Sequence, residues 1–263
     1  MLCLLLVACQ GERVDSTAAP DTGVAIDSAI GDTGCNPPSG VTGTCPDGMV
    51  YIPGGCFDRV DGRHAVVASF CLDAREVTLG AYKDCTAAGS CTPPEKTITK
   101  YPGATDEQVM IESQICNVNW TSRADHPINC VDHTQAVSYC TSRKGRLPTS
   151  DEWEWAARGR SRGSKYPWGD EAPRDQPCWA GVARRGSTCV AGSFAKDETP
   201  DGVRDLGGNV FEWSATESDA TAGWFLMLGG SFGTTETKVM EIGHWYDNKP
   251  DARMNTAGFR CAK

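Results

Sequence analysis

The stretch Gly207-Gly208-Asn209-Val210-Phe211-Glu212-Trp213 is one of an ordered series of short motifs that runs through most of this 263-residue chain. Six of its companions lie upstream and two lie downstream. In chain order they are Met49-Val50-Tyr51-Ile52-Pro53-Gly54-Gly55, Phe70-Cys71-Leu72-Asp73-Ala74-Arg75-Glu76-Val77-Thr78, His126-Pro127, Arg146-Leu147-Pro148-Thr149, Glu152-Trp153-Glu154-Trp155-Ala156-Ala157-Arg158-Gly159, Tyr166-Pro167-Trp168-Gly169, Gly229-Gly230-Ser231-Phe232 and Gly258-Phe259-Arg260-Cys261. No single motif of this series identifies a protein family, but the ordered set does.

Taken together, these motifs resemble the formylglycine-generating enzyme (sulfatase-modifying factor) family over residues 46–263. The resemblance implies an α+β fold similar to that of C-type lectins, with little regular secondary structure and disulfide staples. Capping signals by themselves predict three helices. These cover residues 79–88 after Thr78, residues 134–144 after Asp132, and the segment between Thr149 and Gly159. Short strands are expected at 50–52 and 224–228, and long irregular stretches at 90–130 and 159–200.

The charge of the chain argues against one class of partner, and its hydropathy argues against one kind of segment. The formal net charge of −9 argues against nucleic acid, which calls for a basic surface. The chain contains no apolar run of about 18 residues, so no transmembrane helix is expected.

The first nine residues resemble a bacterial lipoprotein signal. An apolar run ends in Leu6-Val7-Ala8-Cys9, which is similar to a lipobox, and Cys9 is the residue that would be lipidated. Residues 10–44 are rich in Gly, Ala, Ser, Thr, Pro and Asp, so we predict a flexible acidic linker before a domain at 45–263. This organisation predicts a lipid anchor on a membrane surface of the bacterial cell envelope. The alternative is an apolar tail without function.

Cysteine usage indicates an oxidising compartment. Without Cys3 and Cys9, twelve of the 14 cysteines remain, which fits up to six disulfides. The resemblance implies the pair Cys140–Cys261, and a local clamp Cys178–Cys189 is the next expectation. Proximity in the sequence suggests three further pairs, Cys85–Cys91, Cys71–Cys130 and Cys45–Cys56, with the connectivity formally open.

The family's oxidase chemistry uses a copper ion held by two cysteines that follow the Gly-Gly-Ser motif. At the corresponding positions this chain has Thr234 and Val239, and no cysteine lies between Cys189 and Cys261. Neither side chain can hold Cu(I), so we expect no copper and no copper-dependent oxidation. Glu236, His244 and Asp247 could supply a harder metal site in the same region, although their spacing does not support one.

A structural calcium ion is the cofactor that the resemblance implies. Its ligands would be the side chains of Asp205 and Glu212 and the carbonyl oxygens of Gly208 and Val210. The alternative is that Asp205 caps a turn and Glu212 forms an ion pair. Arg260 is expected to form a buried ion pair as well.

These observations favour a non-catalytic, surface-tethered binding or scaffold module over an enzyme. Its ligand would be a peptide, a protein or a glycan, bound at residues 232–257. The expected contact residues on that face are Thr234, Glu236, His244, Trp245, Tyr246 and Asp247. The alternative is an active enzyme of the family, either a formylglycine-generating oxidase or another oxidative enzyme with an unrecognised site.

Overall fold

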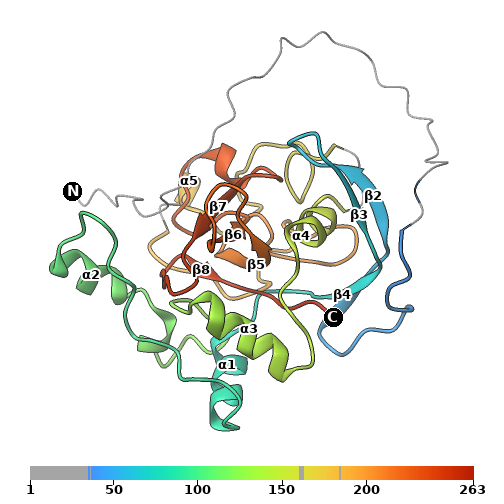
Figure 1. Ribbon diagram of the computed structural model, residues 1–263. Coiled ribbons are helices and arrows are strands. Elements are labelled where there is room, and N and C mark those ends of the chain that lie inside the picture. Colours follow the sequence, from blue (N-terminus) through green and yellow to red (C-terminus); the bar gives the residue numbers. More distant parts are fainter. Residues whose placement is uncertain (1–34, 36, 160–162, 184) are drawn as a thin grey trace.

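A computed structural model describes residues 35, 37–159, 163–183 and 185–263 (Figure 1). The lipobox with Cys9 and the predicted linker up to residue 34 lie outside these residues. Within them, no helix combines the length and the apolar character needed to cross a membrane.

The strands of the described residues form three β-sheets, two antiparallel and one mixed. Strand β1 (Met49–Ile52) pairs with β4 (Phe70–Asp73), and β2 (Gly55–Asp58) pairs with β3 (His64–Val67). The third sheet has the order β7-β6-β5-β8 and lies at the centre of the molecule (Figure 1). Its strands are β5 (Phe211–Glu217), β6 (Phe225–Leu228), β7 (Trp245–Asn248) and β8 (Ala257–Gly258). Strand β8 is parallel to β5, and the other pairs are antiparallel.

The three predicted helices are present within one or two residues of the expected bounds. They are α1 (Leu79–Ala87), α3 (His133–Ser142) and α4 (Ser150–Ala157). The side chains of Thr78, Asp132 and Thr149 accept hydrogen bonds from first-turn backbone N–H groups, which is the capping geometry that the sequence indicates. Figure 1 shows α1 and α3 together below the central sheet, while α4 packs against β3, β5 and β6.

The prediction of an irregular stretch at 90–130 is wrong in part, because helix α2 (Asp106–Ser113) lies inside it. Thr105 and Gln108 form a capping box there, a signal that the sequence carries. Three shorter helical turns complete the fold: η1 (Asn117–Asn119), α5 (Ala180–Ala183) and η2 (Thr237–Met240).

Six disulfides hold the described residues together, as the parity of twelve cysteines suggests. The expected pairs Cys140–Cys261, Cys178–Cys189 and Cys85–Cys91 are present. The pairs Cys71–Cys130 and Cys45–Cys56 are wrong. The structure instead contains Cys35–Cys56, Cys45–Cys71 and Cys116–Cys130. Of these six cysteines, only Cys56 in β2 and Cys71 in β4 lie in strands, and the other four lie in irregular segments. Their pairing depends on the path of those segments, which proximity in the sequence does not reveal.

The Cys35–Cys56 bridge also attaches the start of the described chain to strand β2. The backbone N–H of Val41 donates to the carbonyl oxygen of Ser69, at 3.0 Å. Cys35 and Val41, which lie in the segment that composition assigns to the linker, therefore contact the domain.

Candidate functional site

The Gly229-Gly230-Ser231 segment leaves β6 and is fixed by close backbone packing. Gly229 has a φ of +78°, and a Cβ atom there would lie 2.7 Å from the carbonyl oxygen of Leu206. A side chain is therefore excluded both by the backbone conformation and by the neighbour. The N–H of Phe232 then donates to the carbonyl oxygen of Asn209, which ties the segment to the Gly-Gly-Asn motif.

The two positions that hold copper in the family are filled by structural side chains. Thr234 is buried, and its Oγ1 accepts a hydrogen bond from the N–H of Ser231 at 3.0 Å. Val239 lies in η2 and packs against the core cluster that contains Phe211 and Trp213. A hydroxyl group in a turn and an aliphatic side chain on the core offer no soft ligand for Cu(I).

No free thiol is available from elsewhere among the described residues, because each cysteine there belongs to a disulfide. Cys130, which lies between His126 and His133 in the sequence, is bonded to Cys116. Within the same residues, no group of three or more His, Cys, Asp or Glu side chains converges in a way that could hold a metal ion.

The six residues expected to form a binding face do not form one exposed surface. Thr234 and Asp247 are buried, and Asp247 accepts a hydrogen bond from the hydroxyl of Ser218. Both residues are corrections to the prediction, since buried side chains cannot contact a partner. For Asp247 the reason is strand alternation, because its neighbours Tyr246 and Asn248 in β7 point to the opposite face of the sheet. Thr234 is buried because it closes the turn that begins at Ser231.

The remaining four residues keep some exposure. Glu236 is exposed, and His244, Trp245 and Tyr246 are half-buried. The rings of His244 and Tyr246 meet edge-to-face with centroids 5.0 Å apart. Trp245 and Tyr246 each pack in part against a different core cluster, so a partner could reach only their outer edges.

Glu212, one of the predicted calcium ligands, forms a buried ion pair. Glu212 is 1% exposed, and Arg260 donates to both of its carboxylate oxygens at 2.7 Å. The indole N–H of Trp153 donates to Glu212 Oε2 at 2.8 Å. The expected ion pair of Arg260 is therefore present, and Glu212 has its charge matched by a guanidinium group. The role of Glu212 as a calcium ligand stays a prediction.

Asp205 is placed differently from Glu212. Its backbone is in the left-handed region with a φ of +59°, and its side chain is 1% exposed. Oδ2 accepts a hydrogen bond from the N–H of Gly192, whereas the buried Oδ1 has no hydrogen-bond partner. Burial raises the pKa of Asp205 to about 6.

Sequence analysis missed two further buried acids beside this pair. Both carboxylate oxygens of Asp197 are buried without a hydrogen-bond partner. Glu76 accepts hydrogen bonds from the Asn209 amide and from the N–H of Val210. Burial, reinforced by the nearby charge of Asp205, holds the pKa of Asp197 and of Glu76 well above its ordinary value.

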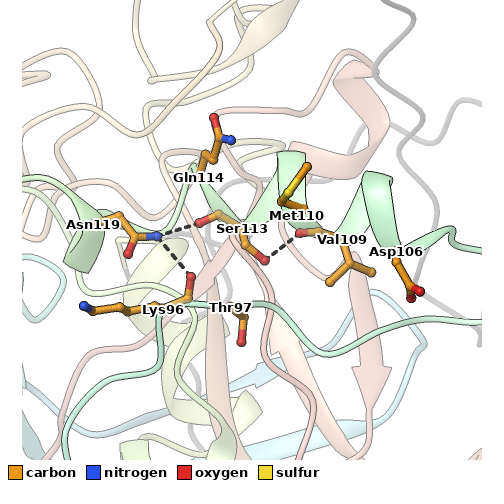
Figure 2. Close-up of a pocket in the computed structure, with 8 residues that line it drawn as sticks. All are labelled: Lys96, Thr97, Asp106, Val109, Met110, Ser113, Gln114 and Asn119. Carbon is orange, nitrogen blue, oxygen red and sulfur yellow. Dashed lines mark hydrogen bonds between the residues drawn. The ribbon is translucent and has the colours of Figure 1, made fainter.

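Two pockets in the described residues lie away from Thr234 and Val239. Figure 2 shows one of them, a 370 Å³ hollow beside α2, where the polar groups of Asn119 and Ser113 are already bonded to backbone carbonyl oxygens. The other, of 520 Å³, lies beside the start of α4, where Arg59 is paired with Asp151. Neither pocket opens onto the positions that hold copper in the family.

Comparison with known proteins identifies the family to which this chain is similar. The model for the sulfatase-modifying factor enzyme 1-like domain matches residues 38–263. A Bos taurus protein named inactive C-alpha-formylglycine-generating enzyme 2 is 32% identical over 157 residues, which are 53% of this chain and 51% of that protein. The Mus musculus formylglycine-generating enzyme is 28% identical over 276 residues, which cover 81% of this chain and 74% of that protein.

Among solved structures, PvdO from Pseudomonas aeruginosa has the same fold, with a TM-score of 0.60 at 24% identity over 81% of this chain and 93% of that chain. The chain spans about half the length of the two inactive relatives, 51% and 48%. With an α+β fold stapled by six disulfides and a family match over nearly all described residues, this chain belongs to the sulfatase-modifying factor enzyme 1-like (formylglycine-generating enzyme) family.

Proposed function

We propose that this chain is a non-catalytic member of its family, a binding or scaffold module that does not convert cysteine to formylglycine. The observation that carries the proposal is the occupation of the copper-binding positions by Thr234 and Val239. Both side chains have structural roles, in a turn and on the core, and every described cysteine is consumed in a disulfide. The match to relatives named as inactive supports a non-catalytic role.

The module is proposed to act at a membrane surface in the bacterial cell envelope, held there by a lipid on Cys9. Its partner would be a peptide, a protein or a glycan. The accessible part of the predicted face comprises Glu236 with the outer edges of His244, Trp245 and Tyr246. A carboxylate and three ring side chains are groups that suit a contact surface, since they combine stacking with hydrogen bonding.

The proposal is tested by a turnover assay. The purified, oxidised protein is incubated with Cu(I), oxygen and a peptide that carries the sulfatase-type Cys-x-Pro-x-Arg motif, and the peptide is read by mass spectrometry. We expect no formylglycine beside a working family enzyme. Formation of formylglycine by this chain would overturn the proposal and favour the alternative of an active oxidase.

Two double variants test whether the missing thiols explain the expected lack of copper binding. T234C/V239C restores both thiols at the family positions, and T234S/V239A changes the same residues without adding sulfur. We expect Cu(I) binding by the first variant and none by the second, because thiolate sulfur is the ligand that Cu(I) selects. Equal copper binding by the two variants would show that the missing thiols do not explain the difference from the family's enzymes.

A further inference from the structure

We infer that the pocket beside the start of α4 is a docking site for an extended basic peptide, which would add as a strand to the free edge of β3. The pocket is lined in part by Val66 and Val67 of β3 and by Ala68, which follows them. The inference goes beyond the proposed function and does not depend on it, because the pocket shares no residue with the predicted face at 232–257.

Among the described residues, strand β3 pairs on one side only, with β2, and Figure 1 shows this hairpin at the periphery beside α4. The N–H of Arg59 donates to the carbonyl oxygen of Arg63 at 2.8 Å, which fixes the alternation of the ladder. Cys56 and Val66 are therefore a non-hydrogen-bonded pair, and the N–H and C=O groups of Val66 point away from β2. No hydrogen bond from another described residue reaches them. An unpaired edge of this kind is a template for a further strand.

The pocket follows this edge. Successive side chains of a strand point to opposite faces, so a hollow that contacts Val66, Val67 and Ala68 runs beside the main chain and not over one face. Other lining residues come from the first turn of α4 and from the end of β5. The volume of 520 Å³ lies within the range of about 300–1,000 Å³ that is typical of ligand pockets. Val66 is 48% exposed, so it offers an apolar contact at the edge.

A buried guanidinium group in the pocket keeps unused hydrogen-bond donors. The side chain of Arg59 is 10% exposed, and its hydrogen bonds to the described residues Ser150 and Asp151 both come from Nη1. Its buried Nε has no hydrogen-bond partner, although a carboxylate oxygen of Asp61 lies 3.4 Å away. Buried polar groups are almost always hydrogen-bonded, so Arg59 indicates a missing acceptor. A main-chain carbonyl oxygen of a bound peptide is such an acceptor, and it adds no negative charge to a pocket that already holds carboxylates.

The charge of the pocket favours a cationic occupant. The guanidinium groups of Arg59 and Arg63 are each paired with two carboxylates, which belong to Asp61, Asp151 and Asp219. Glu217 lies in the same pocket, and its carboxylate accepts a hydrogen bond from a main-chain N–H group. Lys or Arg side chains of a partner complement this excess of carboxylates. The segment 10–34 of this chain does not, because its sequence is itself acidic.

These features together define the sequence of the occupant. Its main chain would pair with Val66, and its successive side chains would point to opposite sides. Basic side chains suit the carboxylates of Glu217 and Asp219, and apolar side chains suit Val66 and Leu226, which line the same pocket. The occupant is therefore a segment in which Lys or Arg alternates with apolar residues.

The test uses the full-length oxidised protein and two fluorescent hexapeptides, Lys-Val-Lys-Val-Lys-Val and its acidic counterpart Glu-Val-Glu-Val-Glu-Val. Binding is measured by fluorescence anisotropy at low salt, and amide hydrogen exchange at Val66 is followed by NMR. V66P removes the outward N–H group, which an edge position tolerates, and V66T is its matched control because it keeps that group. E217Q/D219N removes two charges from the pocket. Its control D106N/E107Q removes two from the first turn of α2, which lies outside the pocket.

We expect the wild-type protein to bind the basic peptide at least about tenfold more tightly than the acidic one, and the bound peptide to slow exchange of the Val66 amide. V66P should bind about tenfold more weakly than V66T, and E217Q/D219N about threefold more weakly than its control.

Four results would each overturn the inference. They are no binding of the basic peptide, equal binding of the two peptides, unchanged exchange at Val66, and equal binding by V66P and V66T. If V66P does not fold, the charge variants decide, and equal binding by E217Q/D219N and D106N/E107Q would overturn the inference.

Discussion

Removal of the Cys140–Cys261 disulfide should destabilise this protein far more than removal of Cys85–Cys91. The first bond closes a loop with a sequence separation of 121, and the second a loop with a separation of 6. In the chain-entropy model, loss of the crosslink lowers the free energy of unfolding by about 5 kcal/mol for the long loop and by about 2 kcal/mol for the short one. Cys140 and Cys261 are also fully buried, so loss of their packing acts in the same direction.

The measurement is guanidinium denaturation of the double variants C140A/C261A and C85A/C91A, each compared with the wild type. Intact-mass analysis must show that the remaining five disulfides of each variant are formed. The difference in the free energy of unfolding between the two variants should be about 3 kcal/mol. Equal losses in both variants would refute the reasoning, because they would show that loop length does not set the contribution of these bonds.

Three other perturbations have defined outcomes. R260M should lower the free energy of unfolding by about 3–5 kcal/mol in urea titrations, because Glu212 would remain buried without its cation; a loss below 1 kcal/mol would contradict this. Burial lowers the pKa of His133, so the unfolded chain binds a proton that the folded chain does not, and stability should fall as the pH drops below about 6.5. H133Q should flatten that part of a stability–pH profile, and an unchanged slope would count against the assignment. G229A should be destabilised by about 2–4 kcal/mol and G223A by only about 1 kcal/mol, because both glycines have positive φ but only Gly229 lacks room for a Cβ atom; equal melting temperatures of the two variants would contradict this.

Local signals explain which parts of the fold could be predicted from the sequence. The helices beginning after Thr78, Asp132 and Thr149 are set by interactions within four residues, and the structure contains all three. Helix α2 has the same kind of signal, since Thr105 is followed by Gln108 three residues later, so the sequence carries the information that predicts this helix as well. Disulfide pairing, in contrast, depends on contacts between residues far apart in the sequence. Cys45 lies before β1, and Cys71 lies in β4 opposite Tyr51, so their bond depends on the path of the chain that leads into β1. Cysteine spacing does not show that path.

The buried acids near Arg260 show a second limit of the sequence. The resemblance identifies Asp205 and Glu212 as a ligand pair, since it transfers residues position by position. It cannot report that Arg260 occupies both oxygens of Glu212, nor that a turn at residues 199–203 places Asp197 opposite Asp205. Unsatisfied buried oxygens are a property of three-dimensional packing, and only a structure with side chains reveals them.

The structure also explains how a member of this family can lack the copper thiols and keep its fold. The turn after Gly229-Gly230-Ser231 is held by the close approach to Leu206, by the hydrogen bond from Phe232 to Asn209 and by the packing of Met240 on an aromatic cluster. None of these contacts involves a thiol. Thr234 also accepts a hydrogen bond from the N–H of Ser231, so the residue at the first thiol position contributes to the turn. Because the scaffold and the copper ligands are separable in this way, substitution of Thr234 and Val239 by cysteine should alter metal binding with little effect on the remaining fold.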